Sequence, residues 1–141
     1  MTEAAIEQLE PLIGAWSAEA LGGVGRAVFE WTLNGAFLTQ RTELDHPEAP
    51  SSLSIYAVNL RGDGFTNHYF DSRGIVRVLS MTFSDGVWTM LRESEDFSAL
   101  NFQQRWTGRF SDNGRRIDGT WEINHGDKWE KDFDMVYVKT G

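Results

Sequence analysis

Turn-forming residues recur along the whole chain at intervals of roughly 10 to 15 residues, and this repetition most constrains the fold. Asn-Gly and Asp-Gly pairs favour the positive φ angles of tight hairpins, which join antiparallel neighbours. The turn signals are Gly22-Gly23, Asn34-Gly35, Pro47 to Pro50, Arg61 to Gly64, Ser72 to Gly74, Asp85-Gly86, Glu95-Asp96, Asp112 to Gly114 and His125 to Asp127. Nine turns in succession predict ten strands that form a meander.

Apolar and polar residues alternate between these turns. Phe29, Trp31 and Leu33 are separated by polar residues, and the last stretch repeats the pattern with Trp129 and Phe133 on one face. A period of two indicates strands with one buried face. A ten-strand meander can stack as two open sheets, but closure removes both exposed edges. We therefore predict an all-β fold, a closed antiparallel meander barrel of about ten strands.

The first dozen residues break this alternation. Ile6, Leu9 and Ile13 recur at helical spacing, Thr2 can cap the helix and Pro11 lies near its end. A chain of 141 residues fits one domain. We expect a single domain, residues 1–141, in which 1–13 form a short helix over one barrel end and 14–141 form the barrel.

Composition narrows the partners. Thirteen basic and 21 acidic residues leave a net charge of -8, which repels nucleic acid and anionic membranes, so we expect neither as a partner. The absence of cysteine excludes disulfides and thiolate chemistry. The N-terminal residues lack the basic start and apolar run of a secretory signal, and no apolar run approaches the ~18 residues that cross a bilayer. These features predict a cytoplasmic protein, with a homodimer left open.

Four segments carry a resemblance to known proteins. They are Leu12 to Trp16 after the short helix, Trp31 to Leu38, Tyr69 to Gly74 and Trp129 to Tyr137. The first is similar to the G-x-W opening of lipocalin-superfold barrels, and in this order the four resemble a bacterial calycin-like β-barrel family of unknown function. The resemblance covers nearly the whole chain and extends more distantly to nitrobindins and fatty-acid-binding proteins. It implies a pocket for a small apolar molecule but no known reaction.

The resemblance has two further implications. In lipocalins the G-x-W tryptophan packs beneath a basic residue of the last strand, which here implies Trp16 beneath Lys139. Nitrobindins hold haem through a histidine near the C-terminal end; the late histidine here is His125, in a turn, and His68 could substitute if the cavity opens on its side. We predict no cofactor, with haem as the alternative. His46, His68 and His125 lack metal-binding spacing, so we predict no metal site.

The stretch Thr66 to Asp71 places a histidine, a tyrosine, a phenylalanine and an aspartate in a row, so the direction of each side chain matters. His68 and Phe70 share one strand face, and the other face, with Asn67 and Tyr69, is more polar. We therefore predict that His68 and Phe70 point into the barrel. His68 is then a hydrogen-bonded wall residue, a ligand contact or a general acid or base.

The same alternation predicts aromatic stripes inside the other strands. A barrel of ten strands encloses more volume than a narrow one, so inward residues should line a cavity that is mostly apolar with a few polar groups. The predicted ligand-binding residues are Trp31, Tyr56, His68, Phe70, Trp88, Met90, Phe102, Gln104 and Trp106.

We expect this protein to bind a small hydrophobic or aromatic molecule in the barrel. An enzyme in which His68 acts as acid or base beside Glu43, Tyr56 or Glu122 is the alternative, although no catalytic residue is assigned. A third hypothesis is a barrel filled by its own aromatic side chains that mediates dimerisation. Each inward assignment assumes straight strands, because one β-bulge reverses the faces beyond it.

Overall fold

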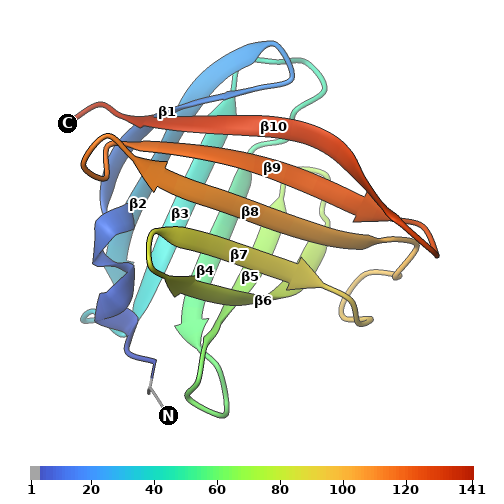
Figure 1. Ribbon diagram of the computed structural model, residues 1–141, viewed down its shortest axis with the longest axis horizontal. Coiled ribbons are helices and arrows are strands. Elements are labelled where there is room, and N and C mark those ends of the chain that lie inside the picture. The colour runs from blue at the N-terminus through green and yellow to red at the C-terminus, as the bar shows by residue number, and fades with distance from the viewer. Residues whose placement is uncertain (1–3) are drawn as a thin grey trace.

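Ten antiparallel strands close into a barrel in the computed structural model, which describes residues 4–141 (Figure 1). The strands follow one another around the barrel in chain order, and β1 pairs with β10 to close it. They are β1 (Gly14–Ala20), β2 (Gly23–Thr32), β3 (Phe37–Leu44), β4 (Ser52–Val58), β5 (Phe65–Asp71), β6 (Val76–Ser84), β7 (Val87–Arg92), β8 (Gln103–Ser111), β9 (Arg116–Asn124) and β10 (Trp129–Lys139). Each predicted turn segment joins two of these strands, and the closed ten-strand barrel is confirmed.

The short hairpins use the residues that the turn signals suggested. Asn34 and Gly35 between β2 and β3 have φ angles of 64° and 80°, and Asp85 and Gly86 between β6 and β7 have 54° and 74°. Asn, Asp and Gly tolerate this left-handed region better than other residues do. Local sequence therefore determines where the chain reverses.

A 3-10 helix, η1 (Ile6–Leu12), covers one end of the barrel. Its buried side chains are Leu9 and Leu12, three residues apart, because three residues make one turn of a 3-10 helix. Pro11 lies inside the helix and Ala5 precedes it as the N-cap, whereas the predicted cap, Thr2, lies outside the described residues. The helix stays at this end partly because the backbone N–H of Ala4 donates to Gly62 in the β4–β5 turn, at 2.7 Å.

The barrel half beneath η1 is solidly packed. Trp16 of β1 is fully buried, and its indole Nε1 donates to the carbonyl of Leu12 at 2.8 Å. Its ring meets Phe110 edge to face at 6.4 Å, and Phe110 meets Phe83 in the same way at 5.5 Å. The Nζ of Lys139 lies 5.1 Å from the Trp16 ring centre, so the contact that the resemblance implied is present. This half of the barrel is a core.

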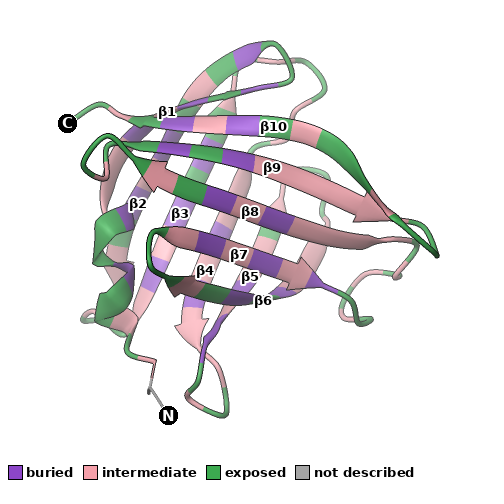
Figure 2. Ribbon diagram, in the orientation of Figure 1, coloured by how far each residue is buried: buried purple, intermediate pink, exposed green. Residues whose placement is uncertain are grey.

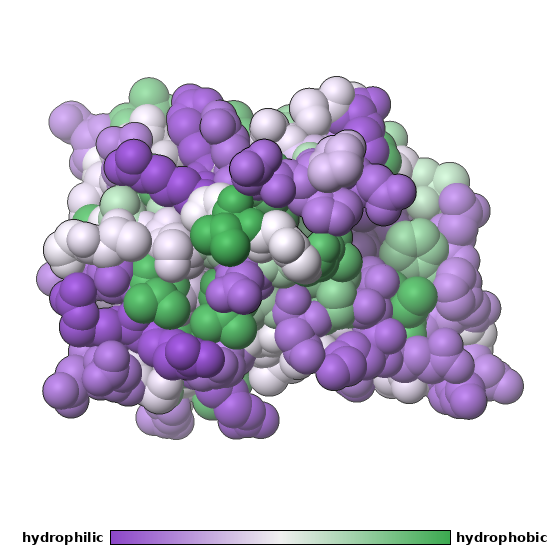
Figure 3. All heavy atoms as spheres, turned by 90° about the horizontal axis from the view of Figure 1, so that it is seen from above, coloured by the Kyte–Doolittle hydropathy of each residue, from purple (hydrophilic) through white to green (hydrophobic). Residues whose placement is uncertain are grey.

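Buried and less buried residues alternate along most strands (Figure 2). Seen from above, the outer surface carries apolar side chains in small groups among polar ones (Figure 3). Within residues 4–141, no helix combines the length and the apolar character that crossing a membrane requires.

Candidate functional site

A cavity of about 400 Å³ occupies the barrel half away from η1. Its rim includes Leu21 of the β1–β2 turn, Pro50 of the β3–β4 loop, Arg73 of the β5–β6 turn and Phe102 of the β7–β8 loop. These connections lie at the barrel end opposite the one that η1 covers. The cavity volume falls within the range of about 300–1,000 Å³ that is usual for small-molecule sites.

Trp88 of β7 separates the cavity from the solid core. Its ring lines the cavity and contacts Phe29 edge to face at 6.1 Å, on the core side. Tyr56 meets Trp88 at 6.3 Å and Trp106 meets it at 5.4 Å, both edge to face. All four rings are at most 1% exposed. The cavity therefore has a fixed aromatic floor.

One cavity wall carries a hydrogen-bond network centred on Gln40 of β3, whose side-chain amide bonds three neighbouring residues. The Gln40 Nε2 donates to Thr42 Oγ1 at 2.9 Å and to the Tyr137 hydroxyl at 3.1 Å. The Tyr56 hydroxyl donates to the Gln40 Oε1. Burial raises the pKa of Tyr137 to about 12. Burial is also the main cause that raises the pKa of Tyr56 well above its ordinary value, and the nearby Tyr137 adds to this effect. Both phenols stay neutral at physiological pH.

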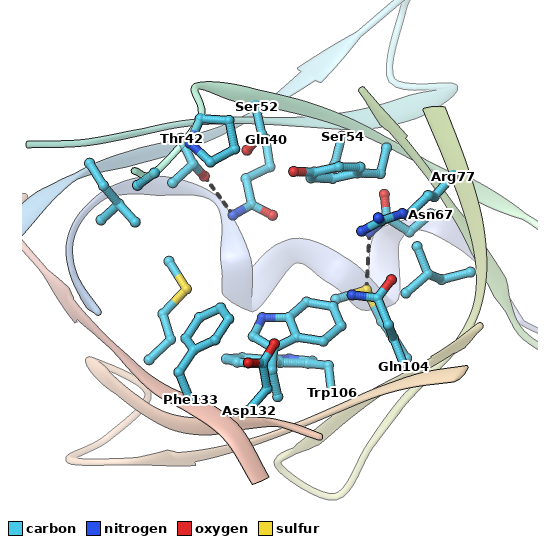
Figure 4. Close-up of a pocket in the computed structure, with 18 of the residues that line it drawn as sticks. Gln40, Thr42, Ser52, Ser54, Asn67, Arg77, Gln104, Trp106, Asp132 and Phe133 are labelled. Atoms are coloured by element: carbon cyan, nitrogen blue, oxygen red, sulfur yellow. Dashed lines mark hydrogen bonds between the residues drawn. The ribbon is translucent and has the colours of Figure 1, made fainter. Parts of the chain in front are cut away.

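Another wall carries Asn67 of β5, Arg77 of β6 and Gln104 of β8, which lie on the same side of the cavity in Figure 4. The Asn67 Nδ2 donates to the Met90 sulfur at 3.2 Å. In contrast to the Gln40 network, this wall is incompletely paired. Asn67 Oδ1 and Arg77 Nε are buried and have no hydrogen-bond partner among residues 4–141.

Two ion pairs brace the rim next to Arg77. Arg73 Nη2 lies 2.6 Å from the Asp71 carboxylate, which also accepts from the Tyr69 hydroxyl at 2.8 Å. Burial opposes ionisation of Asp71, but the hydrogen bonds from Arg73 and Tyr69 keep its pKa below the usual value. Asp71 therefore carries its negative charge at neutral pH.

The second pair anchors the β7–β8 loop, residues 93–102. Arg92 Nε and Nη2 donate to the two Asp96 oxygens at 2.9 Å each, and Arg92 also donates to the carbonyl of Ser98 at 2.9 Å. The Asp96 Oδ2 accepts the backbone N–H of Val78 at 2.8 Å. The bonds from Arg92 lower the pKa of Asp96 far below its ordinary value. This loop is held against β6, so Phe102 has a defined place at the rim.

Six of the nine predicted site residues line the cavity. They are Tyr56, Trp88, Met90, Phe102, Gln104 and Trp106. Trp31 is not among the lining residues: it is opposite Leu38 in the β2–β3 pairing and packs against the core. Trp31 therefore belongs to the packed part of the barrel.

The predicted inward orientation of His68 and Phe70 is wrong. Asn67 is opposite Tyr56 in the β4–β5 register, and Tyr69 is opposite Ser54. Directly paired residues of antiparallel strands share a face, so Asn67 and Tyr69 point inward with Tyr56. Phe70 is 38% exposed, and His68 contacts Thr66 Oγ1 at 3.0 Å on the outer face. Polarity misled the prediction because the cavity wall itself is polar here.

A β-bulge in β10 produces a second difference. The pairing with β9 shifts between Lys131 and Phe133, so Asp132 is an extra residue. Phe133 lines the cavity, whereas Trp129 does not, and Arg105 stacks on the Trp129 ring at 4.2 Å. Trp129 and Phe133, predicted to share a face, are therefore on opposite faces, because an extra residue reverses the alternation.

None of the three histidines, all within the described range, lines the cavity. His46 accepts the backbone N–H of Glu48 at 3.1 Å, and His125 is exposed in its turn, 5.6 Å from the Phe102 ring. An axial histidine ligand for haem inside the barrel is therefore lacking among residues 4–141. In the same residues, no group of three or more His, Asp or Glu side chains could hold a metal ion.

Sequence reasoning missed Asn67, Tyr69 and Arg77 as cavity residues. One signal was available for Arg77, because it shares its strand parity with the apolar Leu79 and Met81 of β6. A cation on the apolar face of a strand is unusual unless it lies at an end or has a role. The inward orientation of Asn67, in contrast, follows only from the β4–β5 register, which pairs it with Tyr56.

No family model matches the chain, and no curated protein matches it either. The resemblance to calycin-like proteins therefore remains a prediction beyond the barrel architecture. The cavity and its side chains are the basis for any functional conclusion.

Proposed function

We propose that this protein binds a small hydrophobic or aromatic molecule in the open half of the barrel. The supporting observation is the contrast between the two halves. Beneath η1 the aromatic rings of Trp16, Phe83 and Phe110 fill the barrel, yet beyond Trp88 about 400 Å³ is left free. A chain that can fill one half with aromatic side chains leaves the other half open, which is the arrangement of a ligand site.

Apolar burial in this cavity supplies a large part of the free energy that reversible binding requires. A ligand that buries about 300 Å² of apolar surface gains about 7 kcal/mol at ~25 cal/mol per Å², before the costs of association. The Gln40 network and the edge-to-face rings hold their positions without a ligand, so little ordering of these groups is required on binding. A micromolar dissociation constant corresponds to about 8 kcal/mol net, so polar contacts with the cavity walls must add to the apolar gain.

Neither alternative function gains support from the geometry. His68 and Tyr56 lie on opposite faces of adjacent strands, so His68 cannot act on a molecule in the cavity. Among residues 4–141, the large exposed hydrophobic residues lie at both ends of the barrel, for example Leu33 in the β2–β3 turn and Phe97 in the β7–β8 loop.

Native mass spectrometry of the freshly purified protein, together with titration of a neutral fluorescent probe such as N-phenyl-naphthylamine, tests the proposal. We expect a bound mass or a saturable rise in probe fluorescence. Ser54 is 5% exposed and lines the cavity, so Ser54→Phe should fill part of it and weaken the probe at least tenfold.

Ser80 is exposed on the outer face of β6 and provides the matched control. Ser80→Phe should bind the probe as the unmodified protein does. An unliganded mass combined with no saturable probe binding would reject the proposal, and unchanged probe affinity in Ser54→Phe would show that the probe binds outside this cavity.

A further inference from the structure

The cavity wall formed by β5, β6 and β7 carries an uncompensated positive charge. Arg73 pairs with Asp71 and Arg92 pairs with Asp96, while Arg77 takes part in no ion pair among residues 4–141. Three arginines against two carboxylates leave one positive charge, 3 − 2 = +1, in a protein whose net charge is -8. The negative charge of the whole protein repels anions at long range. Affinity for an anionic ligand would therefore come from this positive site inside the barrel.

Arg77 lines the cavity, and one of its hydrogen-bond donors has no acceptor within residues 4–141. Its guanidinium lies 5.8 Å from the Phe102 ring, and its Nε is buried without a hydrogen-bond partner within the described chain. Burial and the neighbouring charge of Arg92 hold the pKa of Arg77 below its usual range. An anion at Arg77 would offset both the burial and the repulsion.

The other unpartnered atoms belong to residues that line the same cavity. Within residues 4–141 the buried side-chain nitrogens and oxygens without a partner belong to Asn67, Arg77, Trp88 and Trp106, and all four residues line it. Three of these atoms are donors, on Arg77 and the two indoles, and one is the acceptor Asn67 Oδ1. Buried polar groups in native proteins normally have partners, so the polar groups around this cavity are the least satisfied in the described part of the chain.

We propose that the ligand is an aromatic carboxylate, with its carboxylate at Arg77 and its ring against the indoles of Trp88 and Trp106. The inference rests on the proposed binding function and adds the chemistry of the ligand. An arginine guanidinium matches the planar carboxylate, and one uncompensated charge matches a monoanion better than a dianion. Trp88, Trp106, Phe102 and Phe133 all line the cavity and provide ring surfaces for stacking.

Two carboxylates at the rim do not neutralise this site. Glu48 and Asp132 also line the cavity, but both are exposed to solvent, and the ion pairs found within residues 4–141 do not join either of them to Arg77. Charges in contact with water are screened by solvent and salt much more than partly buried ones. Arg77 remains the charged group that an anionic ligand meets inside the barrel.

Isothermal titration calorimetry with naphthoic acid and naphthamide, at neutral pH and fixed ionic strength, tests the inference. The two compounds have the same ring and nearly the same shape, and differ in charge. We expect the acid to bind roughly ten- to a hundredfold more tightly than the amide.

In Arg77→Met the acid should lose this advantage while the amide keeps its affinity. Arg109 is exposed on the outer face of β8, so Arg109→Met removes the same charge from outside the cavity and should preserve the advantage.

The outcomes separate the two proposals. If the amide binds as tightly as the acid, the charged site is rejected while binding in the cavity stands. If neither naphthalene compound nor the neutral probe binds, the proposed function itself fails. Decanoic acid tests the ring: tighter binding of decanoate than of naphthoate would overturn the aromatic part. The comparison of acid and amide uses the unmodified protein, so it stands even if Arg77→Met does not fold.

Discussion

The indole of Trp106 on β8 occupies the space that a side chain at position 119 on β9 would require. A Cβ built on Gly119 would overlap ring atoms Cη2, Cζ2 and Cζ3 of Trp106. The glycine therefore lets the ring lie against the barrel wall, where it forms part of the cavity lining. The shape of the candidate site therefore depends on a glycine at position 119 of the neighbouring strand.

We accordingly expect Gly119→Ala to lower the free energy of unfolding by about 1–3 kcal/mol, because the added methyl forces Trp106 or the strand to move. Urea denaturation followed by tryptophan fluorescence measures the effect. Gly126 lies in an exposed turn with open space around its Cα, so Gly126→Ala should change stability far less. Equal losses in both variants would contradict the packing argument.

The two buried amides of the cavity should respond oppositely to the same substitution. Gln40 bonds Thr42, Tyr56 and Tyr137, so Gln40→Leu leaves these groups without a partner and should cost about 1–3 kcal/mol of stability. Asn67 has an unpaired Oδ1, so Asn67→Leu should be neutral or stabilising by about 1 kcal/mol. Thermal or urea denaturation of both variants measures the difference. A large loss of stability in Asn67→Leu would show that its carbonyl is satisfied in solution.

Acid should weaken the anchor of the β7–β8 loop. The folded state lowers the pKa of Asp96 through its bonds from Arg92, so the folded state favours the ionised form. The resulting stability is present above the ordinary aspartate pKa of 3.8 and is lost as the pH falls from there toward the folded pKa. We expect the urea midpoint to begin to fall near pH 5 and to continue falling to about pH 2.

Asp96→Ala isolates this contribution. It leaves Arg92, 2% exposed, without its carboxylate and should cost on the order of 3 kcal/mol at neutral pH. The variant should also lose part of the dependence on acid. An unchanged fall of the midpoint with pH in Asp96→Ala would assign the effect to other carboxylates.

All three tyrosines should resist ionisation while the barrel is folded. Burial raises the pKa of Tyr137 to about 12 and raises those of Tyr56 and Tyr69 well above the ordinary value of 10. The unfolded chain releases these protons near pH 10 while the folded chain retains them, so unfolding becomes more favourable as the pH rises beyond 10. Tyrosinate absorbance should stay flat through pH 10 and then rise together with the loss of near-ultraviolet circular dichroism. A gradual rise in absorbance centred at pH 10, in protein that remains folded, would show exposed phenols.

Local sequence was sufficient for the outline of the barrel. Turn residues such as Asn34-Gly35 and Asp85-Gly86 determine their own backbone angles, and alternation between turns specifies half-buried strands. These are short-range effects, so the ten strands and the burial of Tyr56, Trp88 and Trp106 could be predicted without the tertiary structure. The short helix was also predictable, although its 3-10 geometry was not.

The tertiary structure decided which faces point inward where polarity and burial disagree. Asn67 and Tyr69 face the cavity because β5 pairs with β4 in one register, and Trp129 is on the outer face because Asp132 is an extra residue in β10. The unpaired state of Arg77 likewise depends on Asp71 and Asp96 being taken by other arginines. Register, bulges and competition for charge partners join residues that are distant in sequence, so no local pattern contains them.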